Sequence, residues 1–413
     1  MGVLAGSPGP SRERDILGGL MPLACKNDMI PWRGPHARYD VLESGGALRV
    51  RADSWGPTPR KRTIRFAFNA GSEICLNMTT IQSVREDPPA GEEAFIRDLA
   101  DRLKAKIIKD NPTGIMRRDA HPKMHGVVKA EFIVEQHLPE ALRVGIFKEP
   151  KTYLAWIRFS NQSGAIHPDI ARDIRGMAIK LMSVPGKKLL EEEKHEQTQD
   201  FIVISTNVFL TKDVEEFDQL IRALTGSKLS KVGFFATHWR VVWNLIQSMK
   251  KYANPLQIRY WSTTPYLLGT NAVKYSAIPH VHGGDEIPAN PGDDFLREAM
   301  IRQLATGDAL FDFTVQLQIG AETMPIEDPG KAWDETVSPF RKVATIRIPK
   351  QEFDGDRQRE FGENLSYSPW HSLPEHRPLG GINRARKVVY AFISTFRHQR
   401  NQAPRAEPTS WEI

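Results

Sequence analysis

The chain has 413 residues, 40% hydrophobic and 26% charged, which is typical of a globular protein with one large or two ordinary domains. Its net charge of +6 comes without a sustained basic run, which argues against nucleic acid as a partner. No apolar stretch approaches the ~18 residues of a membrane span. Charged residues and prolines also interrupt the N-terminus where a secretory signal would need an apolar run, so we expect a cytoplasmic protein.

Residues 1–90 are rich in Gly, Pro and Arg, and their only strand-like stretch is Thr63–Asn69. We therefore expect an N-terminal extension with little regular structure, followed by a single domain over residues 91–413. Both cysteines, Cys25 and Cys75, lie in the extension, so any metal in the domain must be held by other ligands.

The domain begins with apolar residues at helical spacing, which predict a helix over Glu92–Asp110. Hydrophobic alternation then predicts strands over Val127–Val134, Tyr153–Phe159, Met177–Leu181, Phe201–Ile204, Ala309–Ile319 and Val343–Ile348. Helices are expected over Asp213–Leu224 and Phe234–Tyr252, and the charged run Glu191–His195 indicates a solvated loop. This order of elements predicts an α+β fold, with an antiparallel β-barrel core and surrounding helices.

The first polar cluster, Arg117–Gly126, leads into the first of these strands. His121 and His125 have the spacing of a helical metal-binding pair, but Pro122 between them disfavours the helix. Two alternatives stay open for these residues: acid/base chemistry by one imidazole, or a structural, hydrogen-bonded histidine.

Two further clusters lie in the strand region. Arg158 sits within an otherwise apolar strand and needs an anion, either from the protein or from a ligand. Ser160, two residues later, could orient a nearby imidazole. The alternating charges of Asp169–Lys180 are more typical of a structural ion-pair network than of a site.

The stretch Asn383–Arg397 reads as an amphipathic helix with an unusual polar line. Arg386 and Tyr390 are four residues apart, and Arg397 follows two turns later on nearly the same side. A guanidinium beside a phenol favours the phenolate, which is a ligand for ferric iron. The alternative is an ordinary core tyrosine with two surface arginines.

Taken in order, these motifs resemble the haem catalases and their shorter relatives over roughly residues 113–400. The resemblance rests on His121-x-Lys123, Arg158-Phe159-Ser160, Arg172-Asp173-x-Arg175-Gly176-x-Ala178-x-Lys180, Val208-Phe209 with Asp213 and Phe217, and Arg386-x-x-x-Tyr390. It implies a catalase-like domain that binds haem b.

The resemblance also implies a role for each site residue. Tyr390 would be the iron ligand, held as phenolate by Arg386, and His121 would be the distal acid/base with Ser160 as its hydrogen-bonding partner. The other expected cofactor-binding residues are Arg118, Arg158 and Arg397, near the haem propionates, and Phe217.

Three departures separate the chain from full-length catalases. Their distal Asn position falls at Ile204, with Ser205 next to it, so a side chain that cannot hydrogen-bond replaces one that can. Ala120 precedes the distal histidine, where catalases usually have Val and allene oxide synthases Thr. Only 23 residues follow Tyr390, too few for the C-terminal domain of full-length catalases. The expectation is therefore a minimal catalase-related protein.

The resulting hypothesis is a haem-dependent oxidoreductase acting on hydrogen peroxide or organic hydroperoxides. The apolar residue at Ile204 favours an organic donor or an organic hydroperoxide over fast dismutation of hydrogen peroxide. One alternative is a fatty-acid hydroperoxide isomerase of the allene oxide synthase type, and another is a haem-binding protein with little turnover. The resemblance further implies a homo-oligomer.

Overall fold

The computed structural model describes residues 38–44, 47–53, 62–67, 84–116, 118 and 120–413, which form parts of two compact units, residues 1–81 and 82–413. The first unit contains a small antiparallel sheet with the strand order β1 (Arg38–Ser44), β2 (Ala47–Asp53) and β3 (Arg62–Ala67). β3 overlaps the predicted strand at Thr63–Asn69, whereas β1 and β2 have no counterpart in the prediction. Cys25 and Cys75 lie outside the described residues, and the extent of an N-terminal extension stays a prediction.

The second unit is built on a closed antiparallel barrel. Eight strands pair in the order β4-β5-β6-β7-β8-β10-β11-β12, and β12 pairs with β4 to complete the ring. Their bounds are β4 Met124–Val134, β5 Thr152–Asn161, β6 Arg175–Met182, β7 Thr198–Ile204, β8 Tyr260–Trp261, β10 Asn271–Pro279, β11 Ala309–Leu317 and β12 Arg341–Ile348. The predicted fold class is confirmed.

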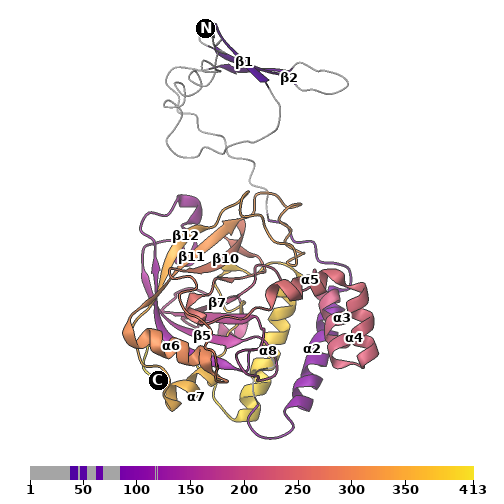
Figure 1. The fold of residues 1–413 in the computed structure, drawn as a ribbon, viewed down its shortest axis with the longest axis vertical. Helices are drawn as coiled ribbons and strands as arrows, with labels where there is room; N and C mark the ends of the chain where they lie inside the picture. Colours follow the sequence, from indigo (N-terminus) through magenta and orange to yellow (C-terminus); the bar gives the residue numbers. More distant parts are fainter. Residues whose placement is uncertain (1–37, 45–46, 54–61, 68–83, 117, 119) are drawn as a thin grey trace, which may run out of the picture. The chain divides into compact units, whose positions relative to one another are not determined.

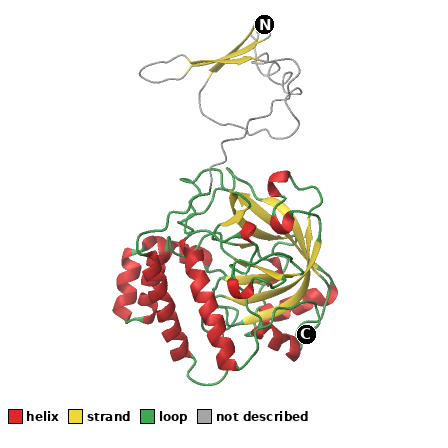
Figure 2. Cartoon of the chain, turned by 180° about the vertical axis from the view of Figure 1, so that it is seen from behind, coloured by secondary structure: helices red, strands yellow, loops and turns green. Residues whose placement is uncertain are grey.

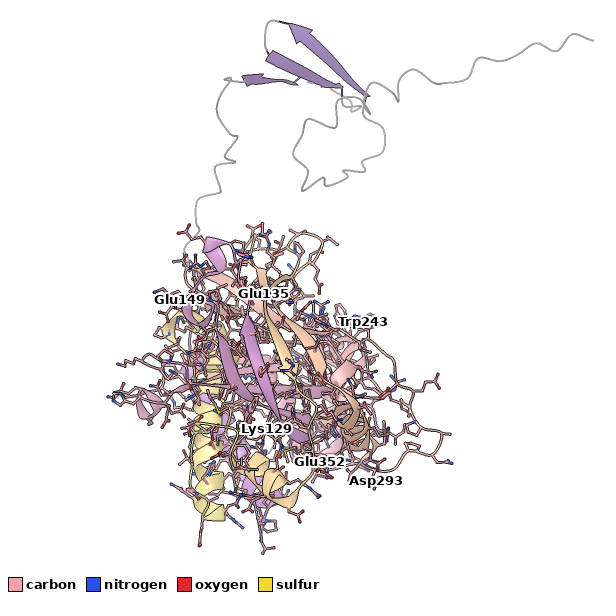
Figure 3. All side chains as sticks on the ribbon, turned by 90° about the vertical axis from the view of Figure 1, so that its left-hand side faces the viewer. Lys129, Glu135, Glu149, Trp243, Asp293 and Glu352 are labelled. Carbon is pink, nitrogen blue, oxygen red and sulfur yellow. The ribbon has the colours of Figure 1, made fainter. Side chains whose placement is uncertain are left out.

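The strands that complete the barrel were the hardest to predict. β8 has two residues, and β9 (Tyr266–Leu268) has three and pairs only with β10. β10 has no clear alternation to reveal it, because six consecutive residues, Ala272–Ala277, are buried. Figure 3 labels Lys129, which lies within β4, and Glu135, which directly follows the last residue of β4.

Most helices gather on one side of the barrel, whereas α6 (Phe295–Thr306) and α7 (Asp356–Asn364) lie apart from them, as Figures 1 and 2 show from opposite directions. The helices in residues 84–413 are α2 Glu92–Asp110, α3 Val214–Thr225, α4 Lys228–Thr237, α5 Trp239–Ser248, α6 Phe295–Thr306, α7 Asp356–Asn364 and α8 Gly381–Asn401. The prediction for α2 is confirmed at both ends. The single helix predicted over Phe234–Tyr252 is wrong, because the chain breaks between α4 and α5 at His238.

Short 3-10 turns complete the described elements. They are η2 Glu140–Leu142, η3 Gly145–Phe147, η4 Glu191–Glu193, η5 Pro255–Gln257 and η6 Pro374–His376. In the part of the chain that the structure describes, no helix combines the length and apolar character needed to cross a bilayer.

The inside of the barrel is filled largely by aromatic rings. Phe132 lies edge-on to Phe313 at 5.0 Å between ring centroids, and Phe201 meets the same ring at 5.0 Å. Tyr275 stacks on it at 5.4 Å. The barrel is therefore a packed core, and the polar residues of interest lie outside it, between the sheet and the helices.

Two buried ion-pair networks fasten the barrel wall. Lys180 Nζ lies 2.7 Å from Asp200 Oδ1 and 2.6 Å from Glu407 Oε2. Asp169 Oδ1 accepts from Lys123 Nζ at 2.8 Å. The structural interpretation of the Asp169–Lys180 charges is therefore confirmed.

The charged run Glu191–His195 is only partly the solvated loop that was predicted. Glu193 is buried, and its carboxylate pairs with His371 and Arg405. An acidic residue in a charged run is normally solvated, and only the fold shows that a distant imidazole and a distant guanidinium meet it here.

Candidate functional site

His121 precedes β4 in a strained backbone conformation. Its φ of +63° lies in the left-handed region, which a residue with a Cβ seldom adopts. Two hydrogen bonds hold this conformation: Arg158 Nη2 donates to His121 O at 3.0 Å, and His121 N donates to Gln162 O at 3.3 Å. Arg158 thus fixes the backbone from which the imidazole projects.

The imidazole of His121 rests on β5 and β6. Its Nδ1 lies 3.0 Å from Ser160 Oγ. A Cβ on Gly176 would lie 2.5 Å from His121 Cε1 and 2.6 Å from Nδ1, so only glycine leaves room for the ring. No described residue hydrogen-bonds His121 Nε2, which leaves this atom available to a ligand.

Ile204 lies beside Gly176 in the sheet, on the neighbouring strand β7. Gly176 pairs with Ser160 on one side and with Ile204 on the other, and directly paired residues present their side chains on the same face. Ile204 therefore lies on the face that carries His121. The neighbouring Ser205 cannot replace a polar group there, because its Oγ accepts from Arg175 N at 2.9 Å.

The second half of the candidate site lies on α8. Arg386 Nη2 donates to Tyr390 Oη at 3.1 Å, and the Arg386 guanidinium carbon lies 5.1 Å from the centroid of the Tyr390 ring. Arg386 Nη1 donates to Asn383 Oδ1 at 3.2 Å, and Thr264 Oγ1 donates to the same oxygen at 3.1 Å. Asn383 is fully buried, so the guanidinium is held in place from behind.

Three arginines from separate elements converge on Glu363 at the end of α7. Arg118 Nη1 lies 3.3 Å from Glu363 Oε2, and Arg158 Nη2 lies 3.5 Å from Oε1. Arg397, two turns after Tyr390 on α8, donates from Nη1 to Glu363 O at 2.6 Å. We call Arg118, Arg158, Arg397 and Glu363 the arginine cluster. It has three cations and one carboxylate, an excess of two positive charges.

The arginine cluster has the electrostatics of an anion-binding site. Burial, followed by the charges of Arg158 and Arg397, lowers the pKa of Arg118 well below its usual value, and Glu363 only partly opposes this. Burial also lowers the pKa of Arg397. Arg158 Nε is buried and has no hydrogen-bond partner among the described residues. Added carboxylates would relieve the repulsion and satisfy this donor.

His121 lies within the field of both halves of the candidate site. Burial, followed by the charges of Arg158, Arg386 and Arg118, lowers its pKa to about 3. The imidazole is therefore neutral at ordinary pH and retains an acceptor nitrogen, as a general base requires. The charge of Arg386, on α8, is thus among the causes of the lowered pKa of His121.

The last predicted residue, Phe217, packs away from these polar groups in an apolar cluster of α2, α3 and α8. Its ring lies 5.5 Å from that of Phe209, edge to face. The same cluster includes Val389, the neighbour of Tyr390 along α8. A cofactor contact for Phe217 stays a prediction.

Sequence reasoning missed several residues that shape the site. Glu363 lies on a short polar helix with no apolar pattern, and nothing in the sequence marks it as the meeting point of three arginines. The Arg175-Gly176 motif did appear, but the contact of Gly176 with His121 depends on strand register. Asn383 opens the predicted helix and carries no separate signal. Among the described residues, no group of three or more His, Cys, Asp or Glu could hold a metal ion.

Comparisons with known proteins agree with this fold. The catalase family model matches residues 92–258, a range that includes His121, Ser160 and Ile204 and ends before α8. A fungal catalase structure matches with 17% identity, 78% of this chain and 66% of that chain covered, and a TM-score of 0.57. A bacterial catalase structure matches with 16% identity, 82% of this chain and 68% of that chain covered, and a TM-score of 0.55. Catalase A from Saccharomyces cerevisiae matches with 17% identity, 81% of this chain and 72% of that chain covered, and a TM-score of 0.56. No curated protein sequence matches the chain.

The closed barrel and its covering helices have the catalase fold. The chain is similar to catalases over the segment that the family model matches and shares their fold. It spans about two thirds of the length of the fungal catalase, with 66% of that chain covered.

Proposed function

We propose that the protein is a haem-dependent oxidoreductase that acts on peroxides, with organic hydroperoxides preferred over hydrogen peroxide. The observation that carries this proposal is the pairing of two opposed groups: the Arg386–Tyr390 hydrogen bond on α8 and a neutral His121 within the field of the same guanidinium. A phenol beside a guanidinium is suited to bind ferric iron, and a neutral imidazole is suited to move a proton.

The residues present fit a haem. Tyr390 would ligate the iron, and the arginine cluster would hold the two propionates, whose charges match its excess of two positive charges. When bound, haem b would supply the iron at which a peroxide O–O bond is cleaved. Phe217 would contribute an apolar contact to the cofactor.

The protein's own contribution to the reaction would come mainly from His121. Its free Nε2 would accept the proton of one peroxide oxygen and deliver it to the other, departing oxygen. Ser160 Oγ, 3.0 Å from Nδ1, would keep the ring in place during both transfers. Ile204 offers no hydrogen bond on the same face, so the site would orient hydrogen peroxide poorly and accept an apolar substrate more readily.

Turnover by the haemin-reconstituted protein tests this proposal. We expect rapid consumption of cumene hydroperoxide with a phenolic donor and little oxygen release from hydrogen peroxide. Ile204→Asn should raise oxygen release about tenfold or more by restoring a polar group beside His121. Oxygen release by the unmodified protein at a rate typical of catalases would contradict the preference.

Two other outcomes would identify the alternatives. Consumption of linoleic acid hydroperoxide without any added donor would indicate an isomerase, which the apolar side chain of Ile204 also suits. Haem binding with no turnover of any peroxide would indicate a haem-binding protein. We also propose a homo-oligomer, which sedimentation of the reconstituted protein would measure, and a cytoplasmic location stays a prediction.

A further inference from the structure

Helices α4 and α5 turn large apolar side chains toward solvent. Leu229 and Val232 of α4 are 84% and 67% exposed, and Trp239, Trp243 and Ile246 of α5 are 75%, 57% and 61% exposed. Three- and four-residue spacings place these side chains on one face of each helix. We call these five residues the α4–α5 apolar face. Figure 1 shows α4 and α5 in the helical part of the fold, and Figure 3 labels Trp243.

The apolar face is not needed to hold the helices in place. Phe234 of α4 and Val241 of α5 are buried and pack together with α3. Asn244 Nδ2 donates to Phe209 O and Leu210 O, both at 3.3 Å, and so ties α5 to the chain before α3. Each helix therefore has a buried face that anchors it and a second apolar face in solvent. Two tryptophans and three aliphatic side chains gathered in this way mark an interaction surface.

The stretch of sequence that carries this face contains no acidic residue. No Asp or Glu occurs between Gln219 and Gly284, whereas the stretch contains the eight basic residues Arg222, Lys228, Lys231, Arg240, Lys250, Lys251, Arg259 and Lys274. Arg240 pairs with Asp328 at 2.6 Å, but Lys228 and Lys231, on α4 itself, form no ion pair with a described residue. Arg222 pairs with Asp98 and Asp218, Arg259 pairs with Glu335, and Lys274 is buried. The surface is therefore apolar, bears tryptophan and carries Lys228 and Lys231 as cations without an ion pair among the described residues.

We propose that the α4–α5 apolar face binds the surface of an anionic lipid bilayer, with the two helices lying in the interface. Tryptophan is enriched where apolar and aqueous media meet, and lysine and arginine are attracted to anionic headgroups. A second copy of the chain fits less well, because a two-fold contact would bring the same lysines of both copies together. Lipid binding is independent of the proposed function and is measured without peroxide.

Flotation of the full-length protein with vesicles tests the proposal. We expect binding to vesicles of phosphatidylcholine with ~30% phosphatidylglycerol and about tenfold weaker binding to pure phosphatidylcholine. Trp239→Ser combined with Trp243→Ser should weaken binding to the anionic vesicles about tenfold or more. Lys228→Gln combined with Lys231→Gln should weaken it several-fold and reduce its dependence on salt.

Matched variants elsewhere on the surface act as controls. Ile319→Ser removes an aliphatic side chain that is 62% exposed, and Lys109→Gln with Lys148→Gln removes two exposed charges. Both should bind vesicles as the unmodified protein does, and far-ultraviolet circular dichroism confirms that each variant is folded. Equal binding by the Trp239/Trp243 variant would overturn the proposal.

Two further results would replace the lipid surface with another occupant. Binding to polyglutamate but not to anionic vesicles would assign the face to an acidic protein partner. Conversion of an oligomer to a smaller species by the two tryptophan substitutions, without any vesicle binding, would assign it to a second copy of the chain.

Discussion

Two charge clusters of this protein, one around Lys180 and the other the arginine cluster, differ in the balance of their charges. Around Lys180, one cation lies between Asp200 and Glu407 at 2.7 and 2.6 Å, and although burial would lower the pKa of Lys180, these carboxylates outweigh it and raise the pKa. In the arginine cluster, Arg118 and Arg158 approach the single carboxylate of Glu363, and Arg397 donates to the backbone oxygen of the same residue. Burial and mutual repulsion lower the pKa of Arg118.

The difference separates a structural network from a binding site. The Lys180 network sets one cation against two carboxylates of the protein itself, so it has no need of an added anion and should affect mainly stability. The arginine cluster lacks anions, so it should affect mainly the affinity for an anionic ligand. The following predictions, from the largest expected effect to the smallest, test that distinction.

Lys180→Met should produce the largest loss of stability, because it leaves Asp200 and Glu407 buried without a cation. We expect the free energy of unfolding to fall by about 3–5 kcal/mol, measured by urea denaturation of the haem-free protein. Adding Asp200→Asn and Glu407→Gln should recover much of the loss by removing the unpaired charges. A loss below ~1 kcal/mol in the single variant would show that Lys180 does not stabilise these two buried carboxylates.

Gly176→Ala tests whether the position of the His121 imidazole, whose backbone Arg158 of the arginine cluster holds, matters for the reaction. The added Cβ would overlap the His121 ring, so we expect kcat/KM for cumene hydroperoxide to fall about 100-fold, equivalent to ~2.7 kcal/mol, while haem binding persists. Gly307→Ala is the matched control, because a Cβ there meets nothing within 4 Å. Unchanged turnover in Gly176→Ala would remove His121 from the reaction.

Buried histidines differ from both charge clusters, because they stay neutral when they are buried. Burial lowers the pKa of His376 to about 3, well below the ~6.5 of an unfolded chain. The unfolded chain therefore binds more protons, and the stabilisation present above pH ~6.5 is lost as the pH falls toward 3, by about 1.4 kcal/mol per pH unit. We expect the free energy of unfolding, measured by urea denaturation from pH 6.5 to 4, to depend less steeply on pH in His376→Gln. The difference in slope should correspond to the uptake of about one proton on unfolding. An identical slope would contradict the shift.

Arg118→Gln should have the smallest effect on stability and a specific effect on binding. Removing one of three mutually repelling cations should change the free energy of unfolding by less than ~1 kcal/mol, while haemin affinity falls about tenfold. Arg118→Lys keeps the charge and should lose less affinity, as titration followed by absorbance would show. A stability loss as large as that of Lys180→Met would erase the distinction between the two clusters.

Local pattern was enough to predict much of the fold. The helix at Glu92–Asp110 and six of the barrel strands follow from hydrophobic periodicity, which is a property of consecutive residues. The sequence predicted an antiparallel barrel as the fold class, but it did not show which strands close the barrel. The strands β8, β9 and β10 were missed, because the first two are too short for a period and the third is buried on both faces.

The candidate site was predictable to a different extent in its two halves. The Arg386–Tyr390 pair lies within one helix, so residue spacing alone brings these side chains together. The arginine cluster joins residues from four segments, and only the resemblance to catalases grouped its three arginines. Glu363, which they share, depends on tertiary packing that no local pattern encodes. The role of each site residue in binding and catalysis stays a prediction.

The central claim is that Tyr390 is the ligand of a haem iron. Haemin titration followed by absorption spectroscopy tests it most directly, with Tyr390→Phe compared to Tyr367→Phe, whose buried hydroxyl has no hydrogen-bond partner among the described residues. We predict a ferric haem spectrum typical of tyrosinate ligation in the unmodified protein and in Tyr367→Phe, and its loss in Tyr390→Phe. The same spectrum in all three proteins, or no haem bound by any of them, would contradict the account.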